Sequence, residues 1–216
     1  GVYNHFMRKE IDEQPVSLRQ TVDGRIEDGR SVLEEFPPEY LDDVSDVVFV
    51  ACGTSYHAAM YGSTLLRRRG IQATALRANE FAHDPMPVTD RTLVVAVTQS
   101  GETADTLASL RAAKESPART LAVTNVVGSS AAREADDALF IRAGPEIGVA
   151  ATKTFSSQVA ALALLADHLE TGRTAQSEGR EAWPDTAEAT ANGGVDGAQL
   201  DELGTLPDAV EAVVSD

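Results

Sequence analysis

The stretch TLVVAVTQSGETADTL, residues 92–107, decides the fold that we predict for this chain. Its first part, residues 92–97, is a short β-branched and apolar run, which is typical of a buried strand. Residues 103–115 place apolar side chains on one face at helical spacing. Between the two patterns, residues 98–103 bring five hydrogen-bonding side chains around one glycine. A strand that turns directly into a helix is the unit from which parallel sheets are built.

The same alternation extends in both directions along the chain. Strand-like runs also occupy residues 46–51, 72–77, 119–124 and 138–141. The helical patterns between the runs cover residues 55–69 and 103–115, with shorter ones at 79–82 and 129–135. Strands that alternate with helices indicate parallel pairing, because each parallel connection must cross over the sheet. We therefore predict an α/β fold, a doubly wound three-layer sandwich with a five-stranded parallel sheet.

Composition changes along the chain predict its organisation. The expected divisions are an N-terminal helical lead-in at 1–44, a sheet domain at 45–170, a polar acidic loop or linker at 171–199, and a short helix at 200–216. Pro15 should interrupt the helical pattern of the lead-in. The longest helical pattern, residues 152–170, closes the sheet domain and is expected to cover one sheet face or a partner.

Charge and cysteine usage exclude several classes of protein. The formal net charge is −16, from 34 acidic and 18 basic residues, so the surface should repel nucleic acid and anionic lipid. Such a charge is typical of solvation at high salt; binding to a basic partner is the alternative. Cys52 is the single cysteine, which rules out an intrachain disulfide and suits the cytoplasm. No apolar run approaches the ~20 residues that cross a bilayer.

Polar loops follow three of the predicted strands, at residues 52–57, 98–103 and 125–130. Ligands of open parallel sheets bind at the carboxyl ends of the strands, where the next helices present free N–H groups. Each loop combines glycine with small hydroxyl residues. One such loop is typical of an ordinary helix cap, but three at one edge favour an anion site. The chain has neither a G-x-G-x-x-G motif after its first strand nor a nucleotide-binding P-loop.

The motifs themselves resemble a known family. FMRKEIDEQP, LRQTVDGR, CGTSYHAAM, TQSGETADTL, LAVTNVVGSSAAREAD and AGPEIGVAATKTF occur in this order. Together they resemble the isomerase part of the glutamine:fructose-6-phosphate aminotransferases, or glucosamine-6-phosphate synthases, from Tyr3 to about Gln158. The loop of the SGET type is shared by other sugar isomerase (SIS) domains, whereas the E-x-x-E-Q-P and GPEIGVA runs are characteristic of this family. The resemblance implies the SIS fold.

The resemblance also implies a sugar-phosphate site. The residues that grip the phosphate would be Thr98, Gln99, Ser100 and Thr103. The same pocket would be lined by Cys52, Gly53, Thr54 and Ser55, with Ser55 nearest the phosphate. The sugar hydroxyls would contact the backbone of Val149, Ala150 and Ala151. Two positions depart from the family pattern, which has serine in place of Thr98 and of Ala151, so Ala151 has lost a hydroxyl.

In that family the whole enzyme converts fructose 6-phosphate and glutamine to glucosamine 6-phosphate and glutamate. The resemblance implies that this chain is the first SIS half of such an enzyme and that it pairs as a homodimer through SIS domains. The family's catalytic glutamate, lysine and histidine belong to the second SIS half, its tail and the neighbouring subunit. We therefore expect no catalytic residue, cofactor or metal in this chain, which alone should be inactive.

Several residues and two other functions stay open at this stage. Cys52 at a helix start is a weak candidate nucleophile, and the histidines lack metal-ligand spacing. Glu146 and Lys153 flank the sugar-contacting segment, either as an internal structural pair or with a direct role. The alternative functions are an SIS-type sugar-phosphate isomerase or deglycase without a glutaminase domain, and a phosphosugar-sensing regulatory domain.

Overall fold

A five-stranded parallel sheet forms the centre of the structure, a computed structural model that describes residues 3–35, 41, 43–177 and 198–215. The strand order is β4-β3-β5-β6-β7, and every neighbouring pair is parallel. The strands are β3 (Asp46–Ala51), β4 (Gln72–Arg77), β5 (Thr92–Val97), β6 (Arg119–Thr124) and β7 (Asp137–Phe140). The predicted fold class is confirmed. The first four strands have the predicted bounds, and β7 begins and ends one residue earlier than predicted.

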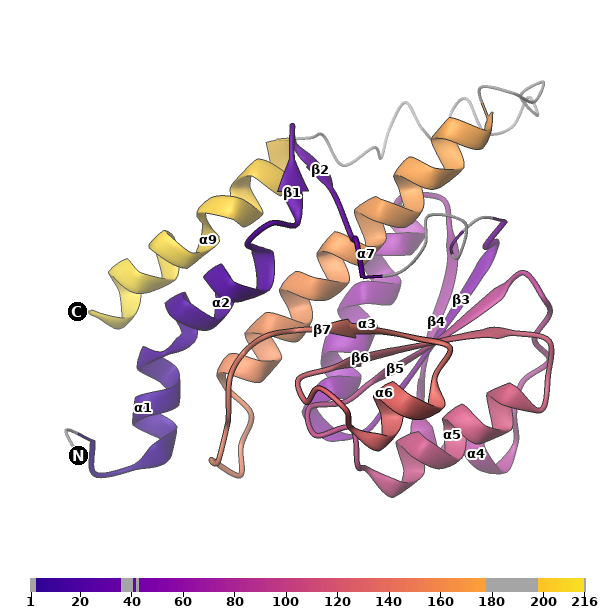
Figure 1. Ribbon diagram of the computed structural model, residues 1–216, viewed down its shortest axis with the longest axis horizontal. Helices are drawn as coiled ribbons and strands as arrows, with labels where there is room; N and C mark the ends of the chain where they lie inside the picture. The colour runs from indigo at the N-terminus through magenta and orange to yellow at the C-terminus, as the bar shows by residue number, and fades with distance from the viewer. Residues whose placement is uncertain (1–2, 36–40, 42, 178–197, 216) are drawn as a thin grey trace.

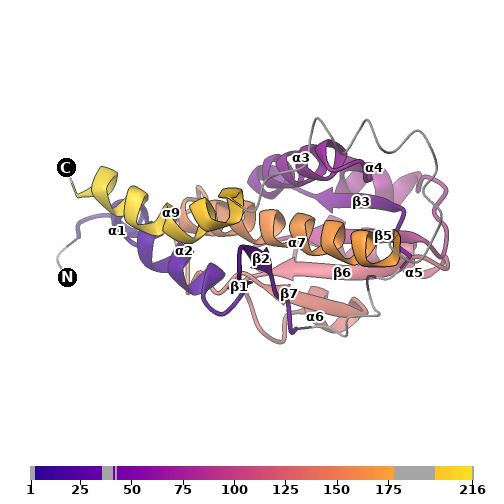
Figure 2. The same ribbon diagram turned by 90° about the horizontal axis from the view of Figure 1, so that it is seen from above.

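Helices cover both faces of this sheet (Figures 1 and 2). One face carries α3 (Gly53–Arg68) and α7 (Lys153–Ser177). The other face carries α4 (Ala78–His83), α5 (Ala104–Lys114) and α6 (Ser130–Glu134). The arrangement is the predicted three-layer sandwich, and the predicted helices agree with these bounds to within two residues, except that α7 ends seven residues later than predicted.

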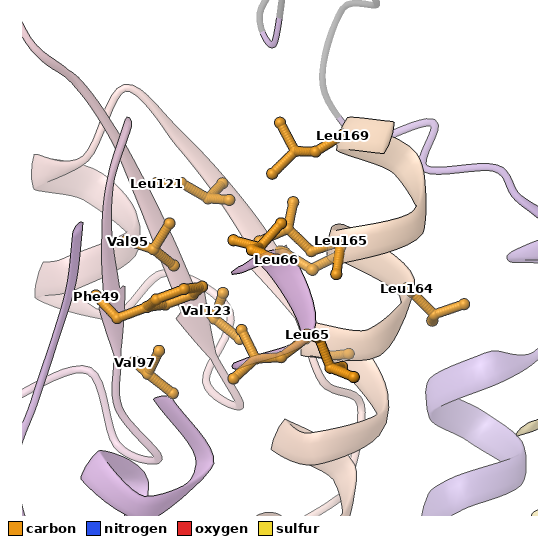
Figure 3. Packing of buried hydrophobic residues seen from close by; sticks show 14 of the residues in the cluster. Phe49, Leu65, Leu66, Val95, Val97, Leu121, Val123, Leu164, Leu165 and Leu169 are labelled. Atoms are coloured by element: carbon orange, nitrogen blue, oxygen red, sulfur yellow. The ribbon is translucent and has the colours of Figure 1, made fainter. Parts of the chain in front are cut away.

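The core forms because the central strands are apolar on both faces, as strands between two helical layers must be. In β3, Phe49 contributes to the cluster under α3 and α7, while Val48 and Val50 contribute to the cluster under the other helices. Figure 3 shows Phe49 between its strand neighbours and Leu66 of α3. Burial of a side chain of this size stabilises the fold by about 1.5–3 kcal/mol. Leu165 and Leu169 complete the layer from α7 (Figure 3).

The lead-in contains α1 (Phe6–Asp12), α2 (Gln14–Val22) and a small antiparallel hairpin of β1 (Ile26–Glu27) and β2 (Arg30–Ser31). The sequence analysis did not predict this hairpin, because two-residue strands carry no hydrophobic alternation. Pro15 lies in the first turn of α2, where its missing N–H costs no helical hydrogen bond. The interruption of the helical pattern that was expected near Pro15 is therefore the break between α1 and α2.

Arg25 connects the lead-in to the end of β7 by hydrogen bonds. The side chain is 1% exposed and donates to the carbonyl oxygens of Thr21 and Phe140 at 2.8 and 2.7 Å. It also forms an ion pair with Glu35. Burial lowers the pKa of Arg25, while its bond to Glu35 acts in the opposite direction. The chain that leaves β7 is thus held beside α2.

The last helices differ in extent from the prediction. Helix α7 continues to Ser177, past the predicted end at Glu170, because the next proline is Pro184 and a single Gly172 costs only about 1 kcal/mol. The rest of the predicted linker, residues 178–197, lies outside the described residues.

Helix α9 (Ala198–Val214) packs beside α2 (Figures 1 and 2). Arg19 of α2 forms ion pairs with Asp208 and Glu211 of α9. In the described part of the chain, no helix is both long enough and apolar enough to span a membrane.

Candidate functional site

Two adjoining cavities open at the carboxyl edge of the sheet, and both are lined by Cys52. The smaller, of about 120 Å³, is lined by Cys52, Ser55, Val97, Thr98, Gln99, Ser100, Thr103 and Thr106. The larger, of about 600 Å³, is lined by Ala51, Cys52, Gly53, Thr54, Tyr56, His57, Arg77, Asn79 and Asp105. The four residues expected to grip a phosphate therefore meet in the smaller cavity, which we call the small cavity. Val149, Ala150 and Ala151 line neither.

The loop at residues 98–103 turns tightly because of Gly101, whose φ of +71° is favourable only for glycine. The hydroxyl oxygen of Thr98 accepts the N–H of Gly101 at 3.2 Å. The hydroxyl oxygen of Ser100 accepts the N–H of Glu102, also at 3.2 Å. A hydroxyl that accepts from the backbone can still donate its own proton. The Ser100 hydroxyl is therefore free to donate into the small cavity.

The helix N-termini beside the small cavity are not closed by side chains. Within the described residues, the N-cap residues of α3 and α5, Cys52 and Thr103, make no side-chain capping hydrogen bond. By contrast, the N-terminus of α6 is closed: Ser129 accepts the N–H of Ala132 at 3.4 Å. The first N–H groups of a helix need acceptors, and the helix dipole favours an anion there. Two helices therefore offer N–H groups to one polar cavity, which suits an anion.

Glu102 is an acidic residue in a loop that is expected to bind an anion. The structure shows why its negative charge does not oppose such binding. Its carboxylate accepts the N–H of Ser130 at 2.8 Å, at the start of α6. This hydrogen bond lowers the pKa of Glu102. The carboxylate does not line either cavity. Of the three polar loops, those after β3 and β5 thus form the small cavity, and the loop after β6 is joined to them through Glu102.

Gln158 is a site residue that the sequence analysis missed. Its side chain is 1% exposed, and its amide nitrogen donates to the hydroxyl oxygen of Ser55 at 2.9 Å. The proton of Ser55 is then free to point into the small cavity. The available signal was a polar residue among the apolar positions of the long helical pattern at 152–170.

Replacement of Gln158 by leucine should weaken anion binding roughly two- to tenfold, because one hydrogen bond that orients Ser55 is worth about 0.5–1.5 kcal/mol. The measurement is calorimetric titration with inorganic phosphate. Gln14→Leu is the matched control, since the side chain of Gln14 accepts from Ser156 of α7 at 2.6 Å, away from both cavities. An affinity loss of the same size in both variants would show that Gln158 acts only through packing.

The other candidate residues make hydrogen bonds or ion pairs with other parts of the chain. Cys52 accepts a hydrogen bond from Thr106 at 3.9 Å and lines the cavities without a basic side chain bonded to it among the described residues. Glu146 accepts the N–H of Thr152 at 2.9 Å. Lys153 is 4% exposed and pairs with Glu13 at 2.7 Å. Glu146 and Lys153 are therefore not partners of each other.

The larger cavity was not foreseen from the sequence. It adds polar and aromatic side chains from four elements, among them Arg77, whose guanidinium lies 5.8 Å from the ring centroid of Tyr56. Asp105, in the first turn of α5, supplies a carboxylate. Among the residues that the structure describes, no group of three His, Cys, Asp or Glu side chains could hold a metal ion.

The fold and the polar loops at its carboxyl edge define a class of protein. Residues 40–167 match the SIS domain family, and the chain belongs to that family. More particularly, it is 50% identical over 216 residues to the glutamine–fructose-6-phosphate aminotransferase (isomerizing) of Halobacterium salinarum, covering 98% of this chain and 33% of that protein. It is 48% identical over 169 residues to the protein of the same name from Thermococcus kodakarensis, covering 77% of this chain and 27% of that protein. The chain therefore spans about a third or less of the length of these curated relatives.

A solved structure agrees with this placement. The C-terminal domain of glucosamine-fructose-6-phosphate aminotransferase from Francisella tularensis superposes with a TM-score of 0.81 and 32% identity. The superposition covers 96% of this chain and 55% of that structure. A glucosamine-6-phosphate deaminase from Thermotoga maritima superposes with a TM-score of 0.63 and 26% identity, covering 80% of this chain and 51% of that one.

Proposed function

We propose that the chain is the phosphosugar-binding SIS domain of a glutamine-dependent fructose-6-phosphate aminotransferase. The observation that carries the proposal is the small cavity, in which neutral donors converge from two helix N-termini. The names of the relatives supply the chemical class of the ligand: fructose 6-phosphate stands in the names of the aminotransferases, and glucosamine 6-phosphate in the name of the deaminase from Thermotoga maritima. In this proposal the whole enzyme transfers ammonia from glutamine to fructose 6-phosphate and isomerises the product.

A phosphate dianion presents three acceptor oxygens, which hydroxyl and amide donors can satisfy without a buried lysine. This matters here because the net charge of −16 opposes the approach of any anion, so capture depends on local donors. Hydrogen bonds to a charged group contribute about 1.5–3 kcal/mol each. We assign the phosphate to Ser55, Thr98, Gln99, Ser100 and Thr103, with Cys52 as a lining residue of the same cavity and Gly53 and Thr54 as lining residues of the larger cavity beside it.

The small cavity holds one end of the ligand only. Its volume of about 120 Å³ is below the ~300 Å³ at which pockets for whole small molecules begin. The sugar must then lie outside the small cavity, where we assign the backbone of Val149, Ala150 and Ala151 to its hydroxyls. Held by its phosphate, the sugar would present its first two carbons to residues outside this chain, which are proposed to perform the proton transfer.

The remaining parts of the proposal concern organisation. We place the phosphosugar domain at residues 45–170, the helical lead-in at 1–44, the linker at 171–199, whose first seven residues continue α7, and the last helix at 200–216. The proposed assembly is a homodimer through SIS domains, in the cytoplasm. A net charge of −16 supports no role in binding nucleic acid or anionic membranes.

The test is calorimetric titration of the chain with fructose 6-phosphate, glucosamine 6-phosphate and fructose. We expect both phosphosugars to bind, and fructose to bind at least tenfold more weakly, because the phosphate supplies charge-assisted hydrogen bonds worth about 1.5–3 kcal/mol each. Equal affinity for fructose and fructose 6-phosphate would refute the proposal.

A further inference from the structure

The segment between β7 and α7, residues 141–152, has no regular secondary structure and passes beside α1 (Figure 1). Its residue Val149 is fully exposed. Such a segment needs side-chain partners to keep one conformation, since ordering each residue costs backbone entropy. The structure supplies these partners as carboxylates at two points, one on each side of residues 149–151.

The first carboxylate belongs to Glu10 of α1, which is 2% exposed. One of its oxygens accepts the N–H groups of Ile147 and Gly148 at 2.6 and 3.0 Å, and the other lies 3.2 Å from the same N–H of Gly148. Gly148 fits the carboxylate closely: a Cβ atom there would lie 2.4 Å from Glu10 Oε2. The contact joins residues 137 and 138 positions apart in the chain.

The second carboxylate is that of Glu146, which accepts the N–H of Thr152 at 2.9 Å and the hydroxyl of Thr152 at 3.1 Å. Next to it, Lys153 pairs with Glu13 of the lead-in. The bond from Lys153 lowers the pKa of Glu13. Both ends of residues 149–151 are thus fixed, whereas the structure gives no hydrogen bond to residues 149–151 from the part of the chain that it describes.

The same segment is connected to the small cavity. The side chain of Asn125 accepts the N–H of Ala143 at 2.9 Å and donates to the carbonyl of Gly144 at 2.7 Å. Its backbone N–H donates to the carbonyl of Gln99 at 3.1 Å, within the loop that forms the small cavity. These hydrogen bonds therefore connect residues 143–144 to the loop at residues 98–103, which forms the small cavity.

We propose that Glu10 is a positioning residue that sets specificity for the sugar. Its buried carboxylate holds residues 147–148, so that the free backbone groups of residues 149–151 face the hydroxyls of a sugar whose phosphate occupies the small cavity. This inference rests on the proposed function. It assigns to the lead-in helix a role in recognition of the sugar, and none in recognition of the phosphate.

The test compares two ligands, fructose 6-phosphate and inorganic phosphate, by calorimetric titration of the full chain. Glu10→Ala should weaken fructose 6-phosphate about tenfold, and inorganic phosphate less than twofold, because only the sugar contacts depend on residues 149–151. Glu10→Gln keeps one acceptor oxygen and should restore most of the affinity. Gly148→Ala displaces the carboxylate from the other side and should reproduce the effect of Glu10→Ala. Arg8→Ala, on the exposed side of α1, is the control and should change neither affinity.

The outcomes separate the inference from the function on which it rests. Equal losses for both ligands, or an unchanged affinity for fructose 6-phosphate in Glu10→Ala and Gly148→Ala, would overturn the positioning role alone. Failure of the unmodified chain to bind fructose 6-phosphate would overturn the proposed function and the inference together. Melting temperatures of the same samples show whether each variant is folded. If Glu10→Ala does not fold, Glu10→Gln and Gly148→Ala still test the same contact.

Discussion

Alanine in place of Gly101 is expected to destabilise the protein by roughly 2–5 kcal/mol and to lower fructose 6-phosphate affinity more than tenfold. At a φ of +71° a side chain costs about 1–2 kcal/mol in any surroundings. Here the new Cβ would also lie 2.2 Å from the hydroxyl oxygen of Ser129, and relief of such a clash costs about 1–3 kcal/mol. The loop cannot move away freely, because the carbonyl of Gly101 accepts the N–H of Ala131 at 2.9 Å.

The control for this prediction is Gly128→Ala in the neighbouring loop. Gly128 has almost the same φ, +74°, but a Cβ there would meet nothing within 4 Å. Gly128→Ala should therefore cost only the ~1–2 kcal/mol of the backbone conformation and leave binding unchanged. Thermal melts of both variants measure the difference, which for a chain of this size is roughly 2–4 °C per kcal/mol. Similar melting temperatures for the two variants would show that the contact with Ser129 is not a tight one.

Ser100→Ala is expected to weaken phosphosugar binding at least tenfold while the protein stays folded. The Ser100 hydroxyl lines the small cavity, and its oxygen already accepts the N–H of Glu102 at 3.2 Å. Its proton is available to a phosphate oxygen, and a hydrogen bond to a charged group is worth about 1.5–3 kcal/mol. The stability cost is limited to a local turn bond of about 0.5–1.5 kcal/mol.

Ser63→Ala tests whether any serine would give this result. Ser63 is buried inside α3, and its hydroxyl donates to the carbonyl of Met60 at 2.9 Å, away from both cavities. Its replacement should leave affinity unchanged. Melting and titration are measured on the same samples. If Ser100→Ala lowers the melting temperature but keeps affinity within twofold, the hydroxyl stabilises only the turn. The assignment of the phosphate to the small cavity would then be wrong.

The sheet was predictable from sequence because its signals are local. Strand β5 and its neighbours are continuous apolar runs bounded by turn residues, and both faces are buried, so hydrophobicity alone marks them. The loop at residues 98–103 was predictable for a related reason: it is one of three loops rich in glycine and hydroxyl residues that follow strands, and three such loops at one edge favour an anion site. Of the residues that the resemblance to a family singled out, six line the small cavity, Gly53 and Thr54 line the larger cavity, and residues 149–151 line neither. Their role as ligands stays a prediction.

What the sequence did not reveal depends on contacts between distant segments. Gln158 reads as one polar residue in an apolar helix until α7 is placed against α3 and reaches Ser55. Glu10 reads as one charge in a charged lead-in until it is buried against Gly148. Glu102 supplies a further acceptor at the N-terminus of α6, for the N–H of Ser130, 28 positions away in the chain. None of these pairings has a periodicity or spacing that a single sequence displays.

The strand order has a consequence for where a ligand can lie. From β3 the chain passes through α3 to β4 on one side, and from β5 it passes through α5 to β6 on the other. Because such crossovers are right-handed, the two helices must leave toward opposite faces of the sheet. The two loops then diverge, and a crevice opens between adjacent strands at this topological switch point. The location of the crevice is thus a property of the winding of the chain, and side chains such as Ser55 and Ser100 determine only what the crevice accepts.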